Sequence, residues 1–177
     1  MEEVMKEEKK SRYFHLITWI QDRLGASPKI RDSGRIARLK RADNPALACQ
    51  AWDILFTLGV REKDFLPCCT VAAAMCRLGS EKDGDASLGL ALASCFEKDA
   101  DKELGGRRLR RLLACSSVEE LCAVLRPVFA YISAKARRKV CFAQLLDEII
   151  AFGVPERQEQ IKLRWARDFW KIAQPED

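Results

Sequence analysis

The chain has 177 residues, enough for one large domain or two small ones, and 48% of them are apolar, which is ample for a packed core. Charged residues make up 32% and the formal net charge is +5, so the surface is heavily charged and mildly basic. The opening segment MEEVMKEEKKSR has no apolar signal core, and no apolar run approaches the roughly 20 residues of a membrane span. We therefore expect neither a secreted nor a membrane-spanning protein.

Eight cysteines are present, and most of them occupy apolar-face positions of predicted helices, where a free thiol behaves as a small hydrophobe. The single histidine, His15, and the absence of a Cys-x-x-Cys pair argue against zinc. We expect buried reduced thiols, no metal, no cofactor and a cytoplasmic protein. The apolar-face cysteines are Cys49, Cys69, Cys76, Cys95, Cys122 and Cys141.

Helical periodicity of the apolar residues runs through the whole chain. Glycine or proline follows several of these stretches, and capping residues precede some of them, as at Ser87 and Asp64. Pro127 falls inside a helical pattern and is a local misfit. In chain order, helices are predicted within residues 4–24, 31–41, 45–58, 64–78, 88–96, 107–113, 118–132 and 142–150, and from residue 155 onward.

No stretch alternates apolar and polar residues, so no strand is predicted. The fold class is all-α, with about eight helices in two small helical bundles. Residues 80–86 (SEKDGDA) form the clearest linker. We therefore place an N-terminal bundle at residues 1–80 and a C-terminal bundle at residues 81–177.

The first basic segment is residues 31–41 (RDSGRIARLKR). Asp32 or Ser33 can cap its short helix. Arg31, Arg35 and Arg38 then share one face, and no acidic residue is expected within reach of it. Ile36 and Leu39 face the other way, with Lys40 and Arg41 beside them.

The second basic segment is residues 107–113 (RRLRRLL), which follows an acidic stretch at 97–106 that we expect to be a loop. On a helix its leucines share one narrow arc, and Arg107, Arg108, Arg110 and Arg111 fill the opposite face. Guanidinium groups held this close repel one another, which favours a polyanionic partner. The alternative is a solvated helix whose arginines pair with Glu103, Glu119 and Glu120. A basic connector follows at residues 135–139 (KARRK).

Catalytic chemistry is missing from the sequence. Gly105 and Gly106 precede a helix but lack the other residues of a phosphate-binding loop. Asp147 and Glu148 are adjacent, so on a helix they point apart and do not converge on a metal. The favoured interpretation is a protein that is not an enzyme.

Several motifs together resemble CasB, the small subunit of the Cascade surveillance complex in type I-E CRISPR systems. They are SLGLALAS, GGRRLRRLL, LLDEIIAFG and IKLRWARDFW, with GRIARLKR similar to the family's Gly-x-x-x-x-Leu-Arg-Arg element. The resemblance covers roughly residues 33–170. The sequence departs from the family at Lys40, where arginine is common, at Cys141–Phe142, where aspartate–tryptophan is common, and at Glu148, where leucine is common.

The resemblance implies two helical bundles, no catalytic activity, and two copies of the small subunit in the complex. It also implies partners: the large subunit, the backbone subunits, guide RNA, the target DNA strand and the displaced strand. Protein contacts to backbone phosphates can tip the nearly balanced exchange of strands in an R-loop. By family position, the expected phosphate contacts are Lys40, Arg41, Arg107, Arg108 and Arg126; the geometry of the helix faces adds Arg35, Arg38, Arg111 and Arg138.

Two other functions stay open. One is an all-α adaptor whose arginines bind an acidic protein. The other is a helix-turn-helix repressor, which fits less well because no helix offers a base-reading Asn or Gln beside its arginines. We also expect the basic segments to merge into one continuous track.

Overall fold

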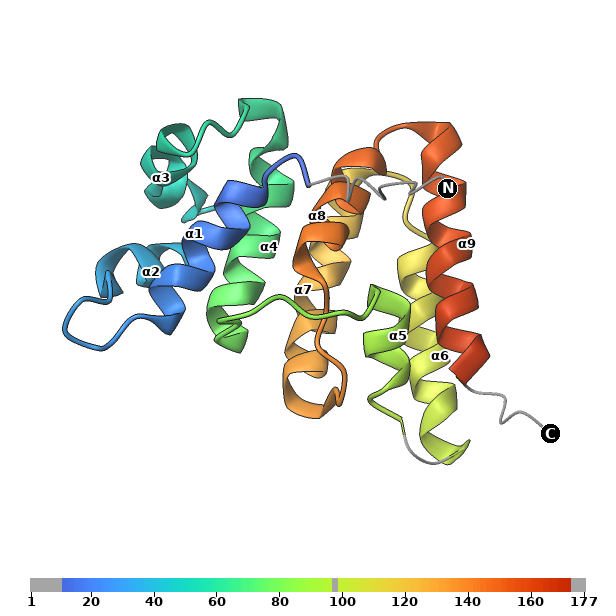
Figure 1. Cartoon of the computed structure of the whole chain (residues 1–177). Helices are drawn as coiled ribbons and strands as arrows, with labels where there is room; N and C mark the ends of the chain where they lie inside the picture. Colours follow the sequence, from blue (N-terminus) through green and yellow to red (C-terminus); the bar gives the residue numbers. More distant parts are fainter. Residues whose placement is uncertain (1–10, 97–98, 173–177) are drawn as a thin grey trace, which may run out of the picture.

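The computed structural model describes residues 11–96 and 99–172, and in these ranges it is all-α, which confirms the predicted fold class (Figure 1). The only strand-like feature in the described part is a single bridge between Ala86 and Val140. The helices are α1 (Phe14–Gly25), α2 (Ser33–Leu39), η1 (Ala48–Ala51), α3 (Trp52–Thr57), η2 (Glu62–Asp64), α4 (Phe65–Leu78), α5 (Leu88–Ala93), α6 (Asp99–Leu113), α7 (Val118–Lys135), α8 (Phe142–Ala151) and α9 (Pro155–Ile172), where η denotes a 3₁₀ helix.

The helices run side by side across the molecule, with α1 to α4 on the left of Figure 1, α7 and α8 in the middle, and α5, α6 and α9 on the right. α4 packs against α7 and α8, while α9 packs along α5. One cluster of buried apolar side chains extends through all of these contacts. The division into bundles at residues 1–80 and 81–177 stays a prediction.

Local sequence signals set most helix ends. Gly59 and Gly79 have positive φ angles of 70° and 63°, the left-handed conformation that glycine adopts most easily after a helix. Asp64, which was predicted to cap a helix, makes no side-chain capping bond to α4. At three other helix starts a side-chain oxygen accepts a backbone N–H group. These are Asp32 with Arg35 N at 3.2 Å, Ser87 with Leu90 N at 3.3 Å, and Ser117 with Glu120 N at 3.2 Å.

The loop predicted at residues 97–106 is wrong over most of its length, because α6 already begins at Asp99. Residues 97 and 98 lie outside the described residues. α6 continues through Gly105 and Gly106, which are both buried. A Cβ atom on Gly105 would lie 2.3 Å from the ring of Phe96, so this glycine permits close packing and does not end the helix.

Two other predicted helices differ from the structure. Within the described residues, the first α-helix begins at Phe14, and residues 4–10 of the predicted range lie outside the described residues. In the range 45–58, a 3₁₀ turn precedes the short helix α3. Pro127, by contrast, does not interrupt α7, which continues to Lys135.

The second half of the predicted linker at residues 80–86 is attached to the start of α8 and the segment before it. Asp83 accepts hydrogen bonds from Phe142 N at 2.5 Å and Ala143 N at 3.0 Å, so its carboxylate caps α8 from a distant part of the sequence. A Cβ atom on Gly84 would lie 1.9 Å from the carbonyl oxygen of Lys139. This close approach of two backbones requires glycine at position 84.

All eight cysteines are free, and most are buried as predicted. Two cysteines are exceptions: Cys141 is only half-buried, and Cys49 is exposed, because η1 carries it on the outside of the molecule. None of the described helices is both long and apolar enough to cross a membrane.

Candidate nucleic-acid interface

The short helix α2 separates its apolar and basic side chains as predicted. Ile36 and Leu39 are buried against the core, and Lys40 and Arg41 are exposed. The Arg41 Nε atom donates a 3.2 Å hydrogen bond to the carbonyl oxygen of Ala37. Lys40 makes no ion pair with any residue in the described ranges.

The expectation that no acidic residue reaches this face is wrong. Arg35 pairs with Asp32 at 3.3 Å, one turn earlier in the sequence. One terminal nitrogen of Arg38 contacts both carboxylate oxygens of Asp53, at 2.9 and 3.0 Å, and the carbonyl oxygen of Gln50 at 3.0 Å. Desolvation raises the pKa of Asp53, but the hydrogen bond and positive charge of Arg38 outweigh it and lower that pKa. Arg38 therefore also ties α2 to α3.

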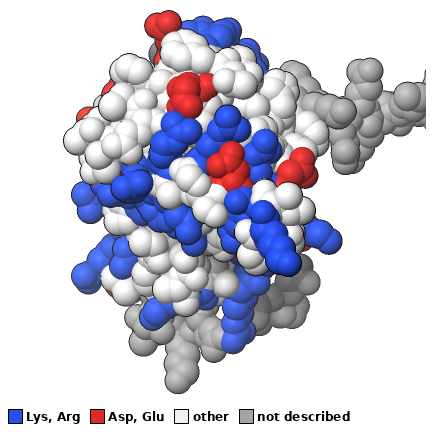
Figure 2. All heavy atoms as spheres, turned by 90° about the vertical axis from the view of Figure 1, so that its left-hand side faces the viewer, with Lys and Arg blue, Asp and Glu red and all other residues white. Residues whose placement is uncertain are grey.

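Basic side chains nevertheless dominate the charged atoms at this end of the molecule. Figure 2 views the end where α1, α2 and α3 lie, and Lys and Arg spread across most of it, with few Asp or Glu between them. An excess of cations on one face attracts a polyanion.

The helix α6 also separates its faces as predicted. Leu109 and Leu112 are buried, and Arg107 and Arg111 are exposed. Of the three acids proposed as partners, only Glu103 pairs with these arginines in the described structure, with Arg107 at 3.5 Å and Arg110 at 2.8 Å.

Glu120 has a different role at the start of α7. Its carboxylate accepts hydrogen bonds from Ser116 N at 2.8 Å and Ser116 Oγ at 3.0 Å, and these bonds lower its pKa.

Arg111 makes no ion pair with any described residue. Among the described side chains, Glu103 is therefore the one carboxylate that pairs with the cationic face of α6.

Arg108 lies on an aromatic ring that the sequence patterns did not single out. Its guanidinium carbon is 4.1 Å from the centroid of the Tyr131 ring on α7. The Lys135 ammonium lies 5.6 Å from the same centroid, and the Phe96 ring stacks on Tyr131 with 5.5 Å between centroids. The Arg108 Nε atom is buried without a hydrogen-bond partner. The sequence contained one signal for this arrangement: Tyr131 lies four positions before Lys135, which places both residues on the same face of a helix.

Arg126, on α7, is held by an acidic residue that no prediction included. Asp43 follows α2, and its carboxylate contacts Arg126 Nε at 3.3 Å. The same carboxylate binds both terminal nitrogens of Arg77, at the end of α4. Asp43 lies far from both arginines in sequence, so no local pattern indicated this cluster.

Arg138 belongs to the connector between α7 and α8. It pairs with Asp85 at 2.9 Å. The Ser94 hydroxyl accepts the backbone N–H groups of Arg137 and Arg138, each at 3.1 Å. The connector therefore has a defined backbone path along the end of α5.

The predicted site residues do not gather in one place. α2 lies at the left end of Figure 1 and α6 on the right, with α7, which carries Arg126, between them. The structure brings the segment after α2 close to Arg126 through Asp43, and it brings Arg108 onto α7 through Tyr131. A single continuous track across all three helices stays a prediction.

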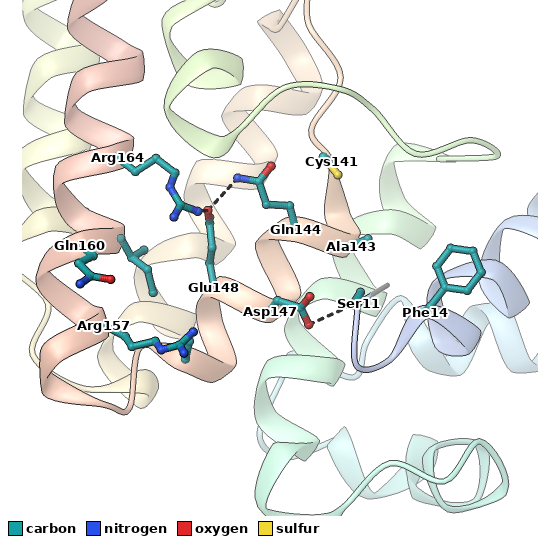
Figure 3. Close-up of a pocket in the computed structure, with 12 residues that line it drawn as sticks. Ser11, Phe14, Cys141, Ala143, Gln144, Asp147, Glu148, Arg157, Gln160 and Arg164 are labelled. Carbon is teal, nitrogen blue, oxygen red and sulfur yellow. Dashed lines mark hydrogen bonds and ion pairs between the residues drawn. The ribbon is translucent and has the colours of Figure 1, made fainter. Parts of the chain in front are cut away.

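A cavity of about 520 Å³ lies between the start of α1, α8 and α9. Its two acidic residues point apart, as predicted: Asp147 accepts from Ser11 Oγ at 3.0 Å, whereas Glu148 turns toward α9 and accepts from Arg164 at 2.8 Å (Figure 3). No group of three potential metal ligands occurs among the described residues.

The family model and the solved structures that match this chain agree on one family. The model of the family "CRISPR-associated protein Cse2" matches residues 35–170 of the chain. No curated protein matches.

Solved structures with the same fold include a CRISPR-associated protein of the Cse2 family from Thermus thermophilus, with a TM-score of 0.69 and 19% identity over 91% of this chain and 99% of that one. A structure of CasB from Thermus thermophilus gives a TM-score of 0.68 and 19% identity over the same shares of the two chains. CasB from M. ruber gives a TM-score of 0.67 and 18% identity, covering 93% of this chain and 95% of that chain.

Proposed function

The chain belongs to the Cse2 family of CRISPR-associated proteins, and we propose that it is a non-catalytic small subunit of a type I-E Cascade surveillance complex. In that complex its basic helix faces bind the phosphate backbone of target and displaced DNA strands and guide RNA, and so stabilise the R-loop. The large subunit, the backbone subunits and a second copy of this chain are its protein partners. The buried free thiols suit a reducing, cytoplasmic location.

The observation that carries this proposal is the excess of cations over carboxylates among the described side chains on the exposed face of α6. Arg107, Arg110 and Arg111 are exposed, and Glu103 is the carboxylate that pairs with this face in the described structure. Exposed guanidinium groups bind phosphate through planar forks and do so without reading the base sequence. Such contacts can tip an R-loop exchange that is otherwise nearly balanced.

The test is binding of fluorescent single-stranded DNA by the purified chain at several salt concentrations. The variant Arg107→Ala/Arg108→Ala/Arg111→Ala removes three cations of α6. A matched control removes three exposed cations that lie elsewhere and make no ion pair in the described structure, Lys63→Ala/Lys82→Ala/Arg157→Ala. Circular dichroism establishes that both variants fold.

We expect salt-sensitive binding that does not depend on base sequence and falls more than tenfold in the α6 variant but much less in the control. The slope of log affinity against log salt should fall by about 0.7 for each phosphate of a single strand that the variant no longer neutralises. An equal decrease in both variants would show that only net charge matters. Equal weak binding by all three proteins would contradict the proposal for the isolated chain.

An apolar groove supports the second candidate, an adaptor that binds protein. It has a volume of about 590 Å³ and is lined by residues of α3 and α4, among them Trp52, Phe56 and Leu66, whose side chains are substantially exposed. Exposed apolar patches of this kind mark protein contacts. Binding of a protein partner through this groove would resist high salt, whereas phosphate binding would not.

A further inference from the structure

The Asp43 carboxylate joins three segments of the chain. It belongs to the turn after α2, and its side chain is only 4% exposed. It binds the two terminal nitrogens of Arg77 at the end of α4, one of them at 2.6 Å, and the Nε atom of Arg126 on α7 at 3.3 Å. A buried carboxylate held in this way orients both guanidinium groups through charge-assisted contacts.

The charges of this cluster do not cancel. Arg77 meets both carboxylate oxygens with its planar fork, which balances the charge of Asp43. Arg126 is the surplus cation, and the cluster carries one net positive charge. The Arg126 side chain is 50% exposed, and its Nε atom lies 3.3 Å from the Asp43 carboxylate. A guanidinium group has five N–H donors, so a half-exposed one can contact this carboxylate and an anion in solvent together.

The same turn fixes the position of two exposed cations. Lys40 and Arg41 precede Asp43 by three and two residues, and consecutive Cα atoms are about 3.8 Å apart, so the Arg41 Cα lies within about 7.6 Å of the Asp43 Cα. Leu39 and Ala42 are buried and anchor the turn on both sides. The turn thus places the backbone of two exposed cations close to the residue whose carboxylate contacts Arg126.

We infer that Asp43 is a positioning residue, which holds Arg126 beside Lys40 and Arg41 so that the three cations contact consecutive phosphates of one strand. This inference rests on the proposed function, because it concerns the same nucleic-acid interface. According to this inference, the acidic residue Asp43 strengthens polyanion binding, whereas its negative charge alone would weaken it.

The test compares Asp43→Asn with Glu62→Gln in the single-strand binding assay. Both substitutions remove one negative charge, and both residues line the same groove beside α3 and α4. Glu62, however, is exposed and makes no ion pair in the described structure. If net charge alone decides affinity, the two variants have equal affinities. Each then binds as tightly as the unmodified chain or slightly more tightly.

We expect Asp43→Asn to bind 3- to 10-fold more weakly than Glu62→Gln, with a salt slope that is smaller by about 0.7, the value for one phosphate of a single strand. Affinity of Asp43→Asn equal to or above that of Glu62→Gln would overturn the inference. The unmodified chain tests the proposed function separately: if it shows no salt-dependent binding, the function fails, whatever the variants do.

A second variant covers the case in which Asp43→Asn does not fold. Arg77→Lys keeps the net charge and replaces a side chain that is 35% exposed. Lysine lacks the fork, so the carboxylate becomes free to engage more of Arg126. We expect binding to weaken 2- to 5-fold at unchanged net charge, and affinity equal to that of the unmodified chain would overturn the inference.

Discussion

The indole nitrogen of Trp165 donates a 2.7 Å hydrogen bond to Oε2 of Glu148, and both side chains are buried. The other oxygen, Oε1, accepts from Arg164 and from Gln144, each at 2.8 Å (Figure 3). A charged side chain therefore occupies a core position between α8 and α9, with both of its oxygens paired. This is the position where the sequence departs from the leucine common in the family.

Glu148→Ala should lower the free energy of unfolding by about 3 kcal/mol, because it leaves the buried Trp165 N–H without an acceptor and opens a space in the core. Urea unfolding followed by tryptophan fluorescence measures this change. Glu103→Ala, which breaks the exposed ion pairs with Arg107 and Arg110, is the control and should change stability little. A decrease below about 1 kcal/mol for Glu148→Ala would show that the hydrogen bonds contribute nothing net.

Tyr131→Ala should weaken single-strand binding about 2- to 10-fold, because the ring beneath Arg108 orients the guanidinium group through a cation–π contact. Tyr131→Phe keeps the ring and should retain most of the affinity. Both variants are measured well below their melting temperatures, since Phe96 also stacks on this ring. Indistinguishable affinities of the two variants would argue against the orienting role.

Asp64→Asn should reduce stability by about 2 kcal/mol at pH 7, because Asp64 accepts a 2.5 Å hydrogen bond from Tyr13 and binds Arg61 at 2.8 Å. Desolvation raises the pKa of Asp64, but these hydrogen bonds and charges outweigh it and hold that pKa below 3.8.

The pH dependence follows from the sign of this shift. A carboxyl group with a lowered pKa stabilises the folded state above its unfolded pKa, and this contribution disappears as the pH falls through its folded pKa. The difference in unfolding free energy between the unmodified chain and Asp64→Asn should therefore be constant above about pH 5 and shrink below pH 3.8. A difference that is equal at pH 7 and pH 3 would contradict this assignment.

Cys49 should be the thiol that reacts first with a disulfide reagent in the native protein at pH 8, because it is exposed. Burial raises the pKa of Cys69 and Cys76 to about 12 and that of Cys122 to about 11, which suppresses their thiolates. Absorbance of the released thiol should show one rapid equivalent, which Cys49→Ser removes, and all eight thiols should react in urea. A rapid phase that survives Cys49→Ser would contradict the prediction.

Local patterns in the sequence determined the helical fold, most helix ends and the faces of α2 and α6. Each of these depends on residues within about one turn of each other: the caps Asp32, Ser87 and Ser117, and the leucines of α6 that separate its arginines from the core. Glycine was the exception, since the same residue ends a helix at Gly79 and permits close packing at Gly105.

Tertiary structure alone decided which charges meet. Asp43 with Arg126, Asp53 with Arg38 and Glu148 with Trp165 are pairs from different helices or turns, and their meeting depends on how whole helices pack. Helical periodicity tells which side of a helix is buried, but it carries no information about which acidic residue of another element lies opposite an arginine. For that reason the basic faces could be predicted from the sequence, whereas the carboxylates that orient or neutralise them could not.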